Sequence, residues 1–287
     1  MTVFVVGNAA LDTTLEVDRL PRPGESILVG AAREDLGGKG LNQAVAAARA
    51  GAQVIFLAAV GDDFAADAIA ERLSIEGIAT RHLRQSAGLT DRTTVFVMRD
   101  AENAIATSVA QAQTRGIDDV ADILEGADTG DVVLMQGNLS QATTVAVAEA
   151  ARARHATVVL NPSPISWDYS DLWPHVDIAV VNADECATLA GIADTVTGAR
   201  RIIDRGVDTV VVTRGAQDVL AVGASRVESC AVPAVTAVDT TGAGDTFCGV
   251  FVAGMAAGIQ QQEATARAVA AAAISVTRRG AISSIPS

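Results

Sequence analysis

The chain has 287 residues, of which 49% are apolar and 19% charged, so it can bury a large core as no disordered chain does. The formal net charge of −13 argues against nucleic acid and anionic membranes as partners, because an acidic surface repels phosphate groups. The three cysteines are widely spaced and match neither a disulfide framework nor a metal site, and no basic leader precedes the first apolar stretch. We therefore expect a soluble protein of the cytoplasm.

Short β-branched runs alternate with Ala-rich stretches of helical periodicity along most of the chain. In chain order the pattern predicts a strand at 3–6, a helix at 42–50, a strand at 54–57, a helix at 64–75, a strand at 132–135, a helix at 142–153, strands at 158–160 and 178–181, a helix at 199–205 and a strand at 209–213. Such repetition predicts an α/β fold with a mostly parallel central sheet and helices on both of its faces. No linker or repeat interrupts residues 1–287, which we expect to form a single domain.

Two segments depart from this alternation. Residues 12–30 read as strand, turn and strand around Pro21-Arg22-Pro23-Gly24, and residues 92–109 alternate in part around a turn at 100–103. We expect these hairpins to form a small β-sheet lid, inserted at approximately residues 12–36 and 91–112, over the carboxyl edge of the larger sheet.

A glycine-rich turn precedes an apolar run that predicts a buried helix at 247–259. The turn reads Asp239-Thr240-Thr241-Gly242-Ala243-Gly244-Asp245. Free N–H groups at the start of a helix attract negative charge, and Gly242 and Gly244 let the backbone approach a ligand closely. A carboxylate at Asp245 is unusual in a phosphate cradle, but it suits a group that accepts a proton beside developing charge. A plain helix cap is the alternative for Asp245.

Spacing excludes two other phosphate-binding motifs. A dinucleotide fingerprint requires Gly or Ala where this chain has Phe247. A Walker loop requires Ser or Thr after Lys39 and Gly at position 33, where this chain has Gly40 and Arg33. A nicotinamide dehydrogenase is therefore not expected.

A second glycine-rich stretch, Gly37-Gly38-Lys39-Gly40, opens another Ala-rich helix. Asn42 and Gln43 follow it, and their amide side chains can both donate to and accept from hydroxyl groups. A flexible loop ahead of a tightly packed helix of small residues would give the same pattern, so the stretch alone does not decide between the two.

Together these stretches resemble the two signatures of the ribokinase-like (PfkB) family of carbohydrate kinases. Four further fragments occur in the family's order, at 161–164, 182–185, 212–215 and 277–281. The resemblance runs nearly from end to end and is closest to the ribokinases around 37–48 and 270–286. It implies an ATP-dependent sugar kinase that transfers the γ-phosphate to a hydroxymethyl group of a small sugar.

The resemblance also implies roles for individual residues. Asp245 takes the proton from the hydroxyl, and the amides of Gly242, Ala243 and Gly244 form an anion hole for the phosphoryl group. The sugar is implied to contact Asp12, Gly38, Lys39, Asn42 and Asn138. The nucleotide is implied to contact Thr213, Arg214, Gly215, Asp218 and Gly244, with Asn182 and Glu185 organising Mg²⁺. A monovalent cation, usually K⁺, is implied near Asp239, Thr241, Ser275, Arg278, Gly280 and Ser284.

Ordinary structural explanations stay open for several of these residues. Asn182 and Glu185 have the spacing of a helix capping box, and Asp12 is a residue type favoured in turns. The segment from Thr213 to Asp218 could be a simple strand-ending turn, and Arg278 with Gly280 fits a normal helix ending.

Two positions depart from the ribokinase pattern, and both bear on the identity of the sugar. Ala10 stands where ribokinases usually carry Asn, and Asn138 where they usually carry Glu, so the sequence leaves ribose specificity open. A nucleoside kinase and a non-catalytic sugar- or nucleotide-binding regulator are the alternatives. Scarce aromatic residues count against a nucleoside, although Phe96 of the lid could stack on a base. Lid hairpins of this family often pair between subunits, which suggests a homodimer.

Overall fold

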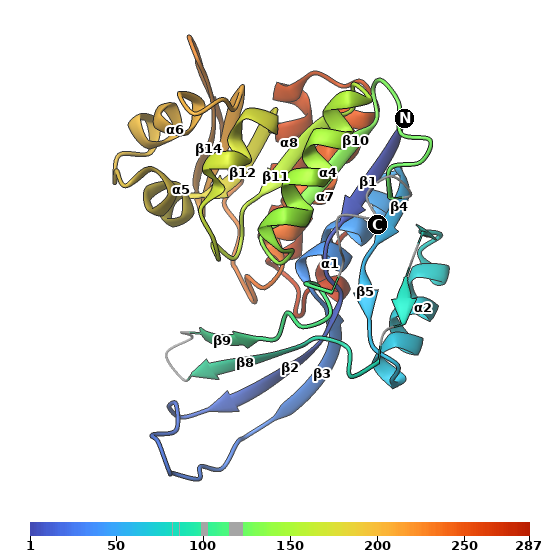
Figure 1. Cartoon of the computed structure of the whole chain (residues 1–287). Helices are drawn as coiled ribbons and strands as arrows, with labels where there is room; N and C mark the ends of the chain where they lie inside the picture. Colours follow the sequence, from blue (N-terminus) through green and yellow to red (C-terminus); the bar gives the residue numbers. More distant parts are fainter. Residues whose placement is uncertain (82, 86, 99–102, 115–122) are drawn as a thin grey trace.

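The structure is a computed structural model that describes residues 1–81, 83–85, 87–98, 103–114 and 123–287. A nine-stranded sheet runs through these residues in the order β15-β14-β13-β12-β11-β10-β1-β4-β6 (Figure 1). Only the pairs β13–β14 and β14–β15 are antiparallel, so the predicted mostly parallel sheet is confirmed. The strands are β1 Thr2–Val6, β4 Gln53–Leu57, β6 Ala79–Thr80, β10 Val132–Gln136, β11 Thr157–Asn161, β12 Ile178–Asn182, β13 Thr209–Arg214, β14 Gln217–Gly223 and β15 Val227–Cys230.

Helices cover both faces of this sheet, as the alternation of strands and helices predicts. On β1, Val3 and Val5 pack toward one layer of helices, while Phe4 and Val6 pack toward the other. Figure 1 shows α4 in front of the sheet and α7 and α8 behind it. The first layer contains α1 Lys39–Arg49, α2 Phe64–Ile75, α7 Ala243–Ala256 and α8 Gln261–Ser275; the second contains α4 Gln141–Ala153, α5 Ala183–Ala190 and α6 Thr195–Ile203. The 3₁₀ turns are η2 Tyr169–Asp171, η3 Trp173–His175 and η4 Ile282–Ser284.

A small sheet extends beyond the carboxyl ends of the central strands, at the bottom of Figure 1. Its order is β3-β2-β8-β9, formed by β2 Ala10–Val17, β3 Ala32–Gly37, β8 Arg92–Met98 and β9 Asn103–Thr107. The strands overlap the two segments expected to form the lid, although β2 begins two residues before position 12 and β3 ends one residue after position 36. Residues 100–102 of the predicted turn at 100–103 lie outside the described residues. A pair of short strands, β5 Ala59–Val60 with β7 Arg84–Gln85, completes the strand pairing.

The first lid hairpin differs from its prediction. Its second strand begins at Ala32, after the apolar run at 27–29 that the sequence pattern places in the strand. Leu28 in that run is 95% exposed, whereas Arg33, Glu34 and Asp35 pair with β2. Strand pairing here follows the contacts with β2 rather than the local hydrophobicity of β3.

Three helices begin earlier than predicted, and a local feature precedes each. Gly38 and Gly242, both with positive φ, precede α1 and α7, so α1 starts at Lys39 rather than 42 and α7 at Ala243 rather than 247. Asp194 caps α6 by accepting from the N–H of Thr197, so this helix starts at Thr195 rather than 199. In the described part of the chain no helix combines the length and the apolarity needed to cross a membrane.

Candidate active site

A cavity of about 720 Å³ lies between the carboxyl ends of the central strands and the inner face of the small sheet; we call it the central cavity. Five neighbouring strands each bring one polar residue to it, at or just after the end of the strand: Asn8 after β1, Asn138 after β10, Asn161 at the end of β11, Asn182 at the end of β12 and Thr213 near the end of β13. Ligands of open α/β sheets bind at this edge.

Asp245 lies in the first turn of α7 and is buried, with 6% of its surface exposed. Its Oδ2 accepts from Asn42 Nδ2 at 2.9 Å, and its Oδ1 accepts from Gln43 Nε2 at 3.0 Å. Gly242 is the residue at the N-cap, and the Asp245 side chain makes these long-range bonds instead of capping the helix. The plain-cap interpretation is therefore wrong, and the carboxylate lines the central cavity.

The predicted anion-hole residues form the turn that leads into α7. A Cβ on Gly242 would lie 3.1 Å from Ala281 Cα, and its φ of +74° suits glycine, so both space and conformation require this residue. Ala243 N–H donates to Thr240 O at a long 3.3 Å. Gly244 is exposed and faces open space, and it lines the central cavity together with Gly242. The first N–H groups of a helix have no partner within the helix, so this turn can receive an anion.

Asp12 lies on β2 of the small sheet and lines the central cavity. Burial raises the pKa of its carboxyl from 3.8 to about 6; the Thr93 hydroxyl opposes this shift, and the negative charge of Asp245 adds to it. Gly37, which pairs with Ala10 on the neighbouring strand, lies beside Asp12, and a Cβ there would overlap the Asp12 carboxylate. The first glycine of the pair therefore makes room for Asp12, whereas the second, Gly38, lies against the backbone of residues 8–10.

Three predicted sugar contacts carry a buried oxygen without a hydrogen-bond partner: Asp12 Oδ1, Asn42 Oδ1 and Asn138 Oδ1. All three residues line the central cavity. Unpartnered buried polar atoms are rare in folded proteins, and each calls for an explanation. A ligand rich in hydroxyl groups would supply the missing donors.

Lys39 and Gly38 complete the predicted sugar contacts in the central cavity. Lys39 Nζ lies 3.8 Å from Asp245 Oδ1. Burial, the largest single influence, acts to lower the pKa of Lys39, but the nearby acidic groups, Asp245 first and then Glu185 and Cys248, together outweigh it, so the net shift is upward. A lysine that stays charged gives this part of an acidic protein a local positive potential.

A second cavity, of about 520 Å³, adjoins the first across Thr213, Thr240 and Gly244. We call it the apolar cavity, because its walls come from small apolar residues of 232–237, α7 and α8. Thr213 and Gly215, two of the predicted nucleotide contacts, line it. Arg214 and Asp218, the other two from this hairpin, line neither cavity: Arg214 Nε donates to Asp218 O, and the Asp218 carboxylate accepts from Ser229.

Asn182 and Glu185 form a complete capping box at the start of α5. Asn182 Oδ1 accepts from the Glu185 N–H at 2.8 Å, and Glu185 Oε2 accepts from the Asn182 N–H at 2.9 Å. The structural alternative is therefore present in the molecule. Both residues also line the central cavity, so the cap does not remove them from a ligand's reach.

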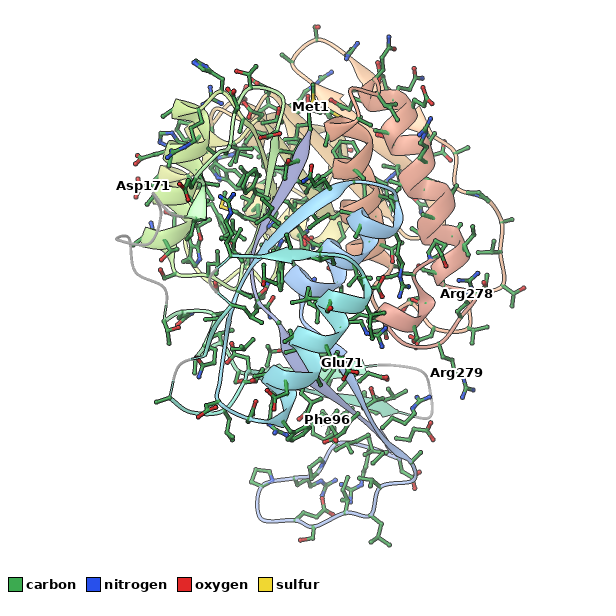
Figure 2. All side chains as sticks on the ribbon, turned by 90° about the vertical axis from the view of Figure 1, so that its right-hand side faces the viewer. Met1, Glu71, Phe96, Asp171, Arg278 and Arg279 are labelled. Atoms are coloured by element: carbon green, nitrogen blue, oxygen red, sulfur yellow. The ribbon has the colours of Figure 1, made fainter. Side chains whose placement is uncertain are left out.

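The residues predicted around a monovalent cation are only partly brought together. Asp239 accepts from the N–H groups of Thr241 and Gly280, each at 2.9 Å, and these three residues line a third cavity of about 550 Å³ beside the central one. The others lie outside the three cavities: the Ser275 and Ser284 hydroxyls donate to carbonyls within their own turns, and Arg278 is exposed at the edge of the molecule (Figure 2). Across the described ranges, no three His, Cys, Asp or Glu side chains cluster as metal ligands would.

The structure also places the residues that bear on substrate identity. Ala10 is fully buried at the start of β2, outside the cavity lining. Asn138 lines the central cavity. Phe96 lies between Val95 and Val97, which line the cavities, so alternation along β8 puts Phe96 on the opposite face of the small sheet. The suggestion that Phe96 stacks on a bound base is therefore wrong.

Several cavity residues were missed from sequence. Thr93 on β8 and Thr107 on β9 are paired with each other, and Thr93 is paired with Asp12, so these side chains form one row across the inner face of the small sheet. Asn161 lines the cavity at the end of β11. The alternation of residues 93–97 was a usable signal for Thr93, whereas strand register, which sequence does not supply, decides that Thr107 joins it.

Comparison with known proteins agrees with this geometry. Residues 2–287 match the model of the pfkB family carbohydrate kinases. The chain is 34% identical to the ribokinase of Haemophilus influenzae over 293 residues, covering 99% of this chain and 95% of that one. It is 31% identical to the deoxyribokinase of Salmonella typhi over 299 residues, covering 100% and 96%.

Solved structures give the same result. The ribokinase of Thermotoga maritima superposes with a TM-score of 0.90 at 30% identity, covering 99% of this chain and 96% of that one. The Arabidopsis thaliana ribokinase, solved with ribose and ATP, has a TM-score of 0.88 at 28% identity, covering 99% and 95%. Fold and family together define an enzyme that transfers a phosphoryl group to an alcohol. The chain belongs to the pfkB family of carbohydrate kinases and is ribokinase-like.

Proposed function

We propose that the protein is an ATP-dependent kinase that phosphorylates a hydroxymethyl group of a small sugar, with Asp245 as the base. The observation that carries the proposal is the position of Asp245: its buried carboxylate lines the polar central cavity one residue after Gly244, which borders both that cavity and the apolar one. A sugar hydroxyl in the central cavity would therefore meet, at this turn, the triphosphate of a nucleotide whose adenine ring occupies the apolar cavity.

In the proposed reaction Asp245 accepts the hydroxyl proton as the alcohol oxygen attacks the γ-phosphorus, and the bond between that phosphorus and the β–γ bridging oxygen breaks to release ADP. Phosphoryl transfer is largely loose, so the protein acts chiefly by positioning and by stabilising charge. The amides of Gly242, Ala243 and Gly244 would face the transferring group, and Lys39 adds positive charge nearby. The Asn42 and Gln43 bonds hold the carboxylate in place.

Mg²⁺ fits this site through Glu185 and Asn182. Mg²⁺ usually keeps several waters, and a cavity-lining carboxylate beside an amide suits a hydrated ion even though the capping box uses one oxygen of each. When bound, the ion would neutralise charge on the nucleotide phosphates. We also propose K⁺ between the 239–241 and 280 segments, which Asp239 ties together.

The sugar is held, in this proposal, by the unpartnered oxygens of Asp12, Asn42 and Asn138, with Gly38 forming the wall. The small sheet acts as the lid. Asn138 is neutral where ribokinases usually carry Glu, and Ala10 has no hydrogen-bonding side chain where they usually carry Asn. The set of sugar hydroxyls recognised here can therefore differ from that of a ribokinase. Curated relatives named ribokinase and deoxyribokinase make both pentoses the first candidates.

The test is a coupled ADP-release assay on purified protein across pentoses, deoxypentoses, hexoses, ketoses and nucleosides, with and without K⁺. We expect turnover with at least one small sugar and a kcat lower by roughly 10²- to 10⁴-fold for the Asp245→Asn variant on the same substrate. Sugar or nucleotide binding without ADP release from any alcohol would support the non-catalytic regulator instead. Preference for a nucleoside would support the nucleoside kinase.

We propose further that the enzyme works in the cytoplasm as a homodimer. All three cysteines, Cys186, Cys230 and Cys248, are free thiols, as expected in a reducing compartment. Leu28, with 95% of its surface exposed, and Val29 lie on the loop of the first lid hairpin, where a second copy would cover them. Sedimentation of the wild type beside a Leu28→Asp variant tests the dimer.

A further inference from the structure

Gln43 is a fully buried residue of α1 that the proposed mechanism uses only as a neighbour of Asp245. Its Nε2 donates to two acceptors, Asp245 Oδ1 at 3.0 Å and Asn161 Oδ1 at 3.1 Å. Its Oε1 accepts from Gln136 Nε2 at 2.8 Å. The side chain does not line the central cavity, so it cannot touch a substrate there and can act only through these partners.

A backbone carbonyl determines which amide groups in this network donate and which accept. Asn161 Nδ2 donates to the backbone carbonyl of Val180 at 2.9 Å, and a carbonyl can only accept. Asn161 must therefore turn its oxygen toward Gln43, and Gln43 must turn its NH₂ group toward both Asn161 and Asp245. A flipped Gln43 would set its carbonyl oxygen against the Asp245 carboxylate and leave Gln136 without an acceptor.

Helix packing brings this amide to the carboxylate. A Cβ on Gly249 of α7 would overlap the carbonyl oxygen of Gln43, and it would also crowd the Ala46 methyl. The glycine therefore lets α1 and α7 pack closely enough for Asn42 and Gln43 to reach Asp245. The four members of the network, Gln43, Asp245, Asn161 and Gln136, come from α1, α7 and the ends of β11 and β10, and the hydrogen-bonded residues are up to 202 positions apart in the chain.

We infer that Gln43 is a positioning residue for Asp245, with Asn161 and Gln136 fixing its direction. The inference rests on the proposed function. The Gln43 donor stabilises the ionised carboxylate and fixes its rotamer, and since Asn42 holds the other oxygen, each oxygen keeps a free lone pair for the alcohol proton.

The test compares three variants with the wild type by pH–kcat profile, sugar KM and Tm. Gln43→Met keeps the length of the side chain and removes its donor. We expect kcat to fall roughly tenfold to hundredfold, the cost of losing a hydrogen bond to a charged group, with sugar KM nearly unchanged. The acid limb of the profile should move to higher pH, because the ionised carboxylate has lost a donor.

Gln43→Glu and Gln136→Met serve as the second variant and the matched control. Gln43→Glu is nearly isosteric and puts a like charge beside Asp245, so its acid limb should move further than that of Gln43→Met. Gln136→Met removes the hydrogen bond from Gln136 to Gln43 but keeps the bond between Gln43 and Asn161. The acid limb of its pH–kcat profile should therefore move least of the three. The charged and titratable groups facing Asp245 are Lys39, Asp12 and Glu185, with Cys248 on its own helix, and they are the same in all variants.

The outcomes separate the inference from the proposed function. If the wild type phosphorylates no alcohol, or Asp245→Asn keeps normal turnover, the proposed function fails. If the wild type is active, Asp245→Asn loses most of its kcat and Gln43→Met keeps the wild-type kcat and acid limb, the positioning role is overturned and the proposed function stands. Should Gln43→Met not fold, Gln43→Glu decides, since an unchanged acid limb in that variant overturns the role.

Discussion

The central and apolar cavities share the Gly244 border but are built in opposite ways. The central cavity gathers polar side chains from strand ends and helices far apart in the chain, and several of their buried oxygens have no partner. The apolar cavity is walled mainly by small residues between 213 and 276, such as Ala234 and Ala272. The first can discriminate between ligands by individual hydrogen bonds, whereas the second selects by shape and burial.

This difference implies that single polar substitutions should act on one side of the turn only. Changes in the central cavity should affect the sugar or the chemical step and leave the nucleotide KM alone. Changes in the apolar cavity should do the reverse. Each substitution below tests one side.

The largest effect is expected from Asp245→Asn. The amide cannot accept the alcohol proton, so kcat should fall roughly 10²- to 10⁴-fold, while sugar binding largely survives. Steady-state kinetics with calorimetric sugar titration separates the two quantities. Near-normal kcat would refute the role of Asp245 as base.

The next effect is expected from Asp12→Asn. Loss of a charged acceptor for a sugar hydroxyl should raise the sugar KM roughly tenfold to hundredfold without changing the nucleotide KM. In the wild type the sugar KM should also rise as pH falls through about 6, where the Asp12 carboxyl becomes protonated. The variant should lack this step, and a wild-type KM that is flat between pH 5 and 8 would contradict the assignment.

The same carboxyl predicts a stability change of defined sign. Its pKa is raised from 3.8 to about 6 in the fold, so ionisation costs more in the folded than in the unfolded chain. That destabilisation is complete above about pH 6 and absent below 3.8. Asp12→Asn should therefore raise Tm of the ligand-free protein at pH 8 and give no gain below pH 3.8, as measured by calorimetry.

A smaller effect is expected on the nucleotide side. Ala272→Phe on α8 would place a ring in the apolar cavity, and the nucleotide KM should rise about tenfold, the equivalent of 1.4 kcal/mol, with the sugar KM unchanged. Ala270→Phe, an exposed position on the same helix, serves as the control for helix stability. Equal effects of both variants would contradict the nucleotide assignment.

The smallest effect is expected from removing K⁺. A cation held near Asp239 would act on the Gly242 turn only indirectly, through its electric field and through the conformation of residues 239–242. Replacing K⁺ by a bulky organic cation should therefore lower kcat/KM by about tenfold or less. The measurement is the ADP-release rate at constant ionic strength. An unchanged kcat/KM would remove the cation from the proposal.

Much of the fold was predictable because the spacing of apolar residues within a segment indicates whether that segment forms a strand or a helix. Six of the nine strands of the central sheet, β1, β4 and β10 to β13, were located within a few residues, whereas β6, β14, β15 and the helices α5 and α8 were not predicted. The glycine-rich turn pointed to Asp245. The positions that failed depend on contacts between distant segments. β3 forms at 32–37 through pairing with β2, and α7 starts at Ala243 because Gly242 adopts positive φ against Ala281.

The site shows the same limit. Asn42 was identified from its motif, but Gln43 reaches Asp245 only because two helices touch at Gly249, and no local pattern reports that contact. Arg214 and Asp218 have the right position in the chain, yet a hairpin bond turns Arg214 toward its neighbour. Side-chain direction is set by tertiary packing, so motif membership alone did not decide which residues line a cavity.

Arg49 of α1 holds residues 282–285 against the body of the protein through its bonds to the carbonyls of Ile282 and Ile285, and the adjacent Ala281 packs on Gly242. The turn proposed to bind phosphate is therefore supported from behind by residues 281–285, so a change at Arg49 could loosen it without touching any residue that lines the central cavity.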